Sequence, residues 1–200
     1  MRAERAVAVF AKAPLAGTVK TRLIARLGEA GAAKLHEQLV ERALATTRAV
    51  ENATVTLWIA GDWPAADALG VSHRPQSGAD LGARMLDAIT QTLTKAEAIV
   101  VVGADCPAMT PAHIEQAFTE LLSHDVVVVP ATDGGYVLIG MRAPHRRLFE
   151  DVSWGTPPVM SATRARCAQL GLRLAELPPL DDLDTPDDLQ RAVDAGLVVV

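Results

Sequence analysis

The sequence predicts an α/β protein with an open, mostly parallel sheet and helices on both faces, organised as a single domain over residues 1–200. Short apolar runs alternate with longer segments of helical periodicity along the chain, and no low-complexity linker interrupts them. The runs 99–103 and 126–129 read IVVVG and VVVV. Continuous β-branched runs of this kind are typical of strands buried on both faces of a parallel sheet.

The periodicity predicts each element in turn. The strands are expected at 6–11, 55–60, 99–103, 126–130, 137–140 and 172–177, and the helices at 29–50, 80–94, 111–122, 158–170 and 187–195. Within 80–94, apolar residues recur every four positions from Leu81 to Leu93, which predicts one buried helix face. Thr-Pro pairs at 110–111, 156–157 and 185–186 predict helix N-caps followed by proline at the first helical position.

The composition narrows the class of function. A net charge of −5 argues against a general nucleic-acid surface, which is usually basic. No apolar stretch approaches the roughly 20 residues that span a bilayer, and the run 6–11 is too short for a signal peptide. Two cysteines without metal-finger spacing indicate free thiols, and Cys106 is expected to be a small buried one. We therefore expect a cytoplasmic protein that binds neither nucleic acid nor membrane.

The loop after the first expected strand concentrates positive charge. The stretch FAKAPLAGTVKTRL, residues 10–23, carries Lys12, Lys20 and Arg22. Ligands of open α/β sheets bind beyond the carboxyl ends of the strands, where this loop lies. Pro14 and Val19 stand where a P-loop needs glycine, which excludes a Walker-type site, and no G-x-G-x-x-G follows a strand. We therefore favour phosphate binding by these three cations over the alternative that they are only solvated charges on a loop.

Two carboxylates follow later strands. Asp105 lies in GADCP and Asp133 in TDGGY, each among small residues. Carboxylate oxygens are the ligands that Mg²⁺ and Mn²⁺ prefer, whereas either residue alone also suits a turn. Because both face the basic loop across the same edge of the sheet, we expect a divalent metal between them. Asp80 is expected to cap a helix, the role of Arg84 stays open, and Asp184 stands out among the late acids.

Six segments together resemble a known family. In chain order they are FAKAPLAGTVKTRL, PQSGADLGARM, GADCP, PATDGGYVLIGMR, LFEDVSWGT and DLDTPDDL. Nearly end to end they resemble the radical-SAM/selenodomain-associated transferases, which include proteins labelled arsenosugar-biosynthesis glycosyltransferases. This family is similar to a branch of the nucleotide-diphospho-sugar transferases, with the GT-A fold. The chain departs from the family at residues 76–80, which read QSGAD where the family has Q-G-x-G-D.

The resemblance implies roles for particular residues. It assigns nucleotide and phosphate binding to Lys12, Gly17, Lys20, Arg22 and Gln76. It matches Asp105 to the metal-binding acid and Asp133 to a second acid at the reaction centre, so both are expected to act in catalysis and to hold Mg²⁺ or Mn²⁺.

The expected function is metal-dependent glycosyl transfer from a nucleotide-sugar to a small acceptor. Two alternatives stay open. One is nucleotidyl transfer from an NTP to a small phosphorylated or acidic acceptor, and the other is a nucleotide-binding module without catalysis.

Overall fold

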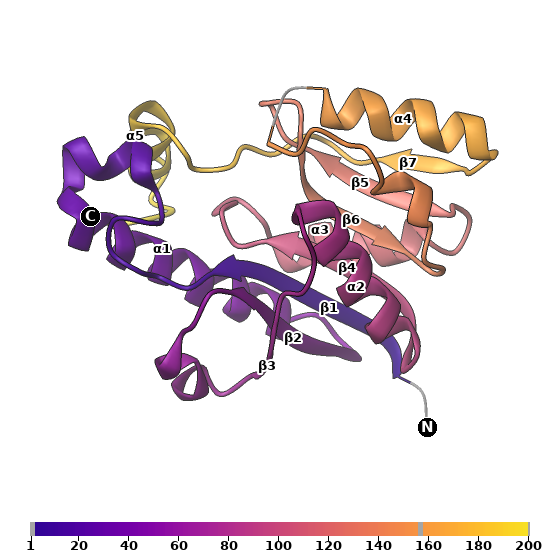
Figure 1. The fold of residues 1–200 in the computed structure, drawn as a ribbon, viewed down its shortest axis with the longest axis horizontal. Coiled ribbons are helices and arrows are strands. Elements are labelled where there is room, and N and C mark those ends of the chain that lie inside the picture. The colour runs from indigo at the N-terminus through magenta and orange to yellow at the C-terminus, as the bar shows by residue number, and fades with distance from the viewer. Residues whose placement is uncertain (1–2, 156–157, 200) are drawn as a thin grey trace.

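Seven strands form one twisted sheet in the order β3-β2-β1-β4-β6-β5-β7 (Figure 1). The structure is a computed structural model that describes residues 3–155 and 158–199. The strands are β1 (Ala3–Lys12), β2 (Ala53–Ala60), β3 (Ser72–Pro75), β4 (Ala96–Gly103), β5 (Val126–Pro130), β6 (Tyr136–Met141) and β7 (Leu174–Glu176). The helices are α1 (Ile24–Arg48), α2 (Leu81–Leu93), α3 (Pro111–Glu120), α4 (Val159–Leu170) and α5 (Pro186–Asp194), with 3₁₀ turns η1 (Thr21–Leu23), η2 (Pro64–Leu69) and η3 (Arg146–Leu148).

The predicted fold class is confirmed, with differences in detail. All pairings are parallel except those of β6, which runs antiparallel to both β4 and β5. β3 was not predicted, because all four of its residues are exposed and leave no apolar pattern. α1 begins five residues before the expected helix and bends at Gly28, whose φ of +71° suits glycine.

Helices cover both faces of the sheet. On one face Val7 and Val9 of β1 belong to a core that α1 and α3 complete. On the other face Ala8 and Phe10 belong to a second core, with α2 and α4. This alternation along β1 is the period of two that a strand imposes, and every other β1 side chain therefore meets a different helical layer.

The expected helix starts are largely observed. Thr110 and Thr185 each form a capping box with the third residue of the helix that follows. Asp80 Oδ1 accepts a hydrogen bond from Ala83 N at 2.8 Å, which confirms it as the N-cap of α2. The Thr156-Pro157 pair lies outside the described residues.

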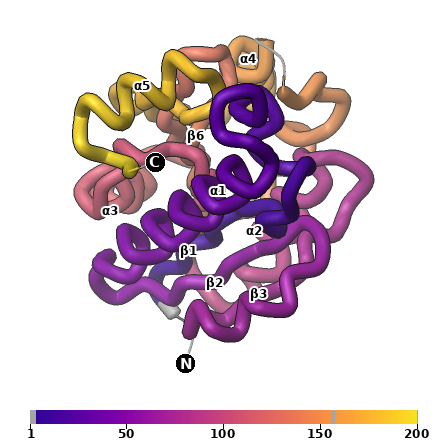
Figure 2. The backbone as a smooth tube through the Cα atoms, turned by 90° about the vertical axis from the view of Figure 1, so that its left-hand side faces the viewer, coloured from indigo at the N-terminus to yellow at the C-terminus, as the bar shows by residue number. Residues whose placement is uncertain are grey.

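The C-terminal segment returns to the start of the chain. Leu189 and Ala192 of α5 pack with Leu35 and Leu39 of α1, and Figure 2 shows α5 beside the first turns of α1. The segment before α5 is tied to the loop after β4, because Leu183 N donates to Asp105 O at 2.8 Å. This docking brings the late acidic residues to the carboxyl end of β4. Within the described residues, no helix is both long enough and apolar enough to cross a membrane.

Candidate functional site

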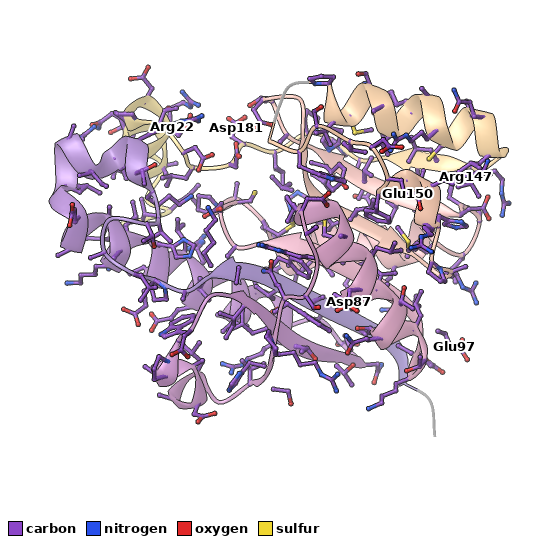
Figure 3. The ribbon with its side chains drawn as sticks, viewed as in Figure 1. Arg22, Asp87, Glu97, Arg147, Glu150 and Asp181 are labelled. Atoms are coloured by element: carbon purple, nitrogen blue, oxygen red, sulfur yellow. The ribbon has the colours of Figure 1, made fainter. Side chains whose placement is uncertain are left out.

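A cavity of about 580 Å³ opens where β1 and β4 end. Four cations line it, namely Lys12, Lys20, Arg22 and Arg84, together with the carboxylates of Asp105 and Asp184. Figure 3 shows Arg22 toward the left of the view and Glu97, from the start of β4, toward the opposite side. The volume falls within the roughly 300–1,000 Å³ usual for small-molecule sites.

The loop that follows β1 turns Lys20 into this cavity. Gly17 has a φ of +79°, which favours glycine, and Thr18 bonds back to Leu15 O through both its N–H and its hydroxyl. Lys20 itself has a left-handed backbone with φ 47° and ψ 41°. That conformation costs a non-glycine residue about 1–2 kcal/mol, so the interactions of the Lys20 side chain must offset it.

Lys20 lies at the centre of an ion cluster. Its ammonium is 2.5 Å from Asp105 Oδ1 and 3.1 Å from Asp184 Oδ1, and it donates to Leu183 O at 2.6 Å. Only 3% of the Lys20 side chain is exposed, whereas 44% of each carboxylate side chain remains accessible. The two aspartates therefore share one buried cation while still facing the cavity.

The electrostatics of the cluster favour its ionised form. Burial alone would raise the pKa of Asp105, but the ammonium of Lys20 and the nearby His36 outweigh it and hold that pKa well below its usual value. Burial lowers the pKa of Lys20, yet Asp105 and Asp184 together leave it raised. His36 Nδ1 lies 3.6 Å from Asp105 Oδ1, and its Nε2 is 3.0 Å from Lys12 O. His36 of α1 thus lies between the backbone of Lys12, at the end of β1, and the carboxylate of Asp105, just after β4.

Asp133 occupies a different position. Its Oδ1 accepts from Gly135 N at 2.9 Å, and the residue lines a second, smaller cavity. Asp133 lies in the loop between β5 and β6, and β6 pairs directly with β4, whose end carries Asp105. Among the described residues, no three His, Cys, Asp or Glu side chains are arranged to hold a metal ion. The metal site predicted from Asp105 and Asp133 stays a prediction.

Asp182 is a site residue that the sequence analysis missed. It also lines the smaller cavity, and burial together with Asp184 and Asp133 raises its pKa to about 6. In the sequence it is one of several acids before α5, and nothing local separates it from its neighbours. Asp184, by contrast, already stood out among the late acids of the sequence, and its carboxylate does reach the ion cluster around Lys20.

Gln76 lies in the larger cavity with its donors already engaged. Its Nε2 donates to Ala11 O at 3.1 Å and to Trp58 O at 2.9 Å, which ties together the ends of β1 and β2. The carbonyl oxygen of Gln76 is the group left for a ligand, and this oxygen accepts hydrogen bonds, as phosphate oxygens do. The geometry therefore suits an N–H donor such as a nucleobase amide better than a phosphate.

Cys106 is not positioned as a nucleophile. The residue is buried, and that burial raises the pKa of its thiol to about 11. A thiol with so high a pKa is protonated at neutral pH and weakly reactive. The expectation of a small buried cysteine is confirmed.

Comparison with protein families identifies the family of this chain. Residues 36–156 match the DUF2064 family, described as an uncharacterized protein conserved in bacteria. The chain belongs to this family. No curated protein matches it.

Solved structures share the fold. The chain is 29% identical to a presumptive nucleotide-diphospho-sugar transferase from Desulfovibrio desulfuricans G20, with a TM-score of 0.87 over 94% of this chain and 85% of that one. A Methanothermobacter nucleotidyl transferase has a TM-score of 0.70 at 16% identity, covering 97% of this chain and 98% of that one.

A CMP-2-keto-3-deoxy-manno-octonic acid synthetase complexed with CTP has a TM-score of 0.63 at 13% identity, covering 98% of this chain and 100% of that one. These likenesses confirm the predicted nucleotide-diphospho-sugar transferase fold for this DUF2064 member.

Proposed function

We propose that the chain transfers a glycosyl group from a nucleotide-sugar to a small acceptor with the help of Mg²⁺ or Mn²⁺. The observation that carries the proposal is the buried Lys20 ammonium between Asp105 and Asp184, at the floor of a cavity lined by further cations. The likeness to the Desulfovibrio protein supports the transferase class. Membership in the radical-SAM/selenodomain-associated branch is part of the same proposal.

The cations suit a diphosphate. Lys12 and Arg22 are exposed residues of the basic loop, and Arg84 lies at the start of α2 with its Nε on Gly78 O at 3.2 Å. A guanidinium offers a planar fork of donors and an ammonium a point charge, and both neutralise phosphate oxygens. The nucleotide would lie with its diphosphate over residues 12–22 and its base toward Gln76.

The residues present fit a divalent ion that arrives with phosphate. Asp105 Oδ1 is a buried anionic oxygen that lies 2.5 Å from the Lys20 ammonium, and a divalent ion would balance its charge when that ammonium turns to a bound phosphate. Mg²⁺ is commonly held by one or two carboxylates plus substrate phosphates and water rather than by a complete protein cage. Asp105 and Asp184 supply such carboxylates. Bound there, the ion would neutralise charge that develops on the diphosphate.

Lys20 has two successive roles in this proposal. In the ligand-free protein its ammonium compensates the charges of Asp105 and Asp184. When a nucleotide and its metal bind, the ammonium leaves these carboxylates and turns to the diphosphate, where it stabilises the leaving group. Loss of one such contact typically reduces the rate about 10²–10³-fold.

Glycosyl transfer then requires an acceptor on the opposite side of the sugar. The acceptor oxygen bonds to C1 as the bond from C1 to the diphosphate oxygen breaks, and the nucleoside diphosphate leaves with that electron pair. The acceptor proton passes to a facing carboxylate, for which Asp133 is the candidate.

Nucleotidyl transfer is the second candidate, because two solved structures with this fold are nucleotidyl or CMP-sugar-forming enzymes. A thermal-shift panel separates the two. The purified chain is heated with Mg²⁺ or Mn²⁺ and with NDP-sugars, NDPs or NTPs, because a ligand that binds the native state raises its melting temperature. Stabilisation by one NDP-sugar and its NDP supports glycosyl transfer. Stabilisation by an NTP alone supports nucleotidyl transfer, and no stabilisation by any of them contradicts both.

A further inference from the structure

A second cavity of about 200 Å³ adjoins the first. Both cavities are lined by Phe10, Gly103 and Trp154, so they are chambers of one site. The walls of the smaller chamber come mainly from the core on the α2 and α4 face and from the loop between β5 and β6. The buried apolar side chains that line it include Phe10, Met85, Val101, Val137, Ile139 and Val159.

Aromatic contacts hold the wall between the chambers. Trp154 meets Tyr136 edge to face with ring centroids 6.3 Å apart, and it stacks on Phe149 at 6.2 Å. Its indole also packs directly against Gly82 of α2, where a Cβ would come within 2.4 Å of Nε1. Trp154 therefore has three neighbours that fix its ring, and the shape of the smaller chamber follows from its position.

The two chambers have opposite charge. The larger one is lined by Lys12, Lys20, Arg22 and Arg84 against the two carboxylates of Asp105 and Asp184, so positive charge is in excess there. Among the described residues that line the smaller one, the charged side chains are Asp133 and Asp182 alone. The chamber is thus apolar over most of its surface and anionic at one end.

We propose that the smaller chamber binds the acceptor, and that the acceptor is a small apolar molecule whose reacting end is a hydroxyl or an amine. This inference rests on the proposed function, because it names the acceptor of the same site. Like charges brought together across a binding site cost several kcal/mol, so Asp133 and Asp182 disfavour a phosphate or carboxylate at that end.

The walls also select against a polar body. A sugar carries hydroxyl groups around its whole ring, and each one buried without a partner loses the hydrogen bonds it made with water. Apart from the two carboxylates at one end, the polar side-chain groups in the described lining are the Tyr136 hydroxyl and the Trp154 indole N–H, so the chamber holds few partners for a full ring of hydroxyl groups. Its volume is below the roughly 300 Å³ at which drug-sized ligand sites begin, which limits the occupant to a small molecule. The chamber therefore favours a phosphate-free acceptor and disfavours the phosphorylated or acidic acceptor of nucleotidyl transfer.

A matched panel of four probes tests the charge preference. Benzyl alcohol, benzylamine, benzoate and benzyl phosphate share one aromatic body and differ in the head group. Their dissociation constants are measured by ligand-observed NMR on the full chain. We expect the alcohol and the amine to bind at least about tenfold more tightly than the two anions. Equal or tighter binding of the anions, or no binding by any probe, overturns the proposal.

Variants locate the binding. Val159→Phe fills the chamber and should abolish binding of benzyl alcohol. The double change Asp133→Asn and Asp182→Asn should remove the disadvantage of benzoate and leave the alcohol bound. Asp181→Asn is the control, because Asp181 accepts from Thr132 and lines another cavity. If the alcohol still binds the folded Val159→Phe variant, or if benzoate stays weak in the double variant, the proposal is wrong.

Nucleotide binding is followed in parallel and keeps the two proposals apart. NDP binding with no probe binding would refute the acceptor chamber alone. Probe binding with the expected preference but no NDP binding would refute the proposed function and leave the chamber as a small-alcohol or amine site.

Discussion

Replacement of Lys20 by methionine removes the cation from the buried ion cluster while keeping the length of the side chain. The ammonium has three oxygen partners between 2.5 and 3.1 Å, and its side chain is 3% exposed. Breaking a buried ion pair by removing one partner costs about 3–5 kcal/mol. Here both carboxylate side chains are 44% accessible and water screens them, so we expect a loss of about 2–3 kcal/mol in the free energy of unfolding.

A divalent ion should then replace the missing charge. In Lys20→Met the carboxylates of Asp105 and Asp184 are left without their cation and become a site for Mn²⁺ without any nucleotide. At a concentration one hundredfold above its dissociation constant, Mn²⁺ would return about 2.7 kcal/mol. In the wild-type chain Lys20 already occupies this position, so Mn²⁺ alone should add at most a few tenths of a kcal/mol.

The assay is urea unfolding of both proteins, with and without Mn²⁺ and free of nucleotide. Lys12→Met is the matched control, because Lys12 is an exposed cation of the same loop and the same cavity. We expect it to change stability by less than about 0.5 kcal/mol and to show no response to Mn²⁺. Equal stabilisation of the wild type and Lys20→Met by Mn²⁺ would refute the view that Lys20 holds the metal position.

Three other changes test separate parts of the site. The raised pKa of Asp182, about 6, means that wild-type stability falls as the pH rises from about 4 to 7. Asp182→Asn should therefore be more stable than wild type at pH 8 by about 1–2 kcal/mol, after allowance for its partial exposure, and equal to it at pH 4. Gly82→Ala places a Cβ 2.4 Å from Trp154 Nε1, so it should cost about 1–3 kcal/mol and shift the tryptophan fluorescence. Unchanged fluorescence would mean that Trp154 does not lie on α2. Gln76→Leu removes both amide donors to β1 and β2 and leaves two carbonyls unpaired, which should cost about 1–3 kcal/mol in urea unfolding.

Much of the fold follows from local patterns in the sequence. Continuous β-branched runs predicted β4 and β5, because strands covered on both faces must be apolar throughout. Threonine-proline pairs predicted the starts of α3 and α5. β3 escaped prediction because it is an exposed edge strand that only its hydrogen bonds to β2 define.

The candidate site was predictable where it depends on strand ends and not where it depends on packing between distant segments. The positions of the basic loop and Asp105 follow from the rule that ligands bind beyond the carboxyl ends of strands. The contact of Lys20 with Asp184 joins residues 164 positions apart, and it exists because α5 packs on α1. The placement of Asp133 beside Asp182 follows from the segment after β7, which runs parallel to the end of β5 through the Ala131–Leu180 bridge and the Thr132–Asp181 hydrogen bond. No local sequence pattern predicts the contact of Lys20 with Asp184 or the placement of Asp133 beside Asp182.

The central claim is that the larger cavity binds a nucleoside diphosphate together with a divalent ion. Isothermal titration of the wild-type chain with UDP, GDP, CDP and ADP, with and without Mn²⁺, tests it most directly. We predict that at least one of them binds, at least about tenfold more tightly with Mn²⁺ than without it, and that Asp105→Asn removes this difference. Absence of binding by all four, or binding that Mn²⁺ and Asp105→Asn leave unchanged, would contradict the account.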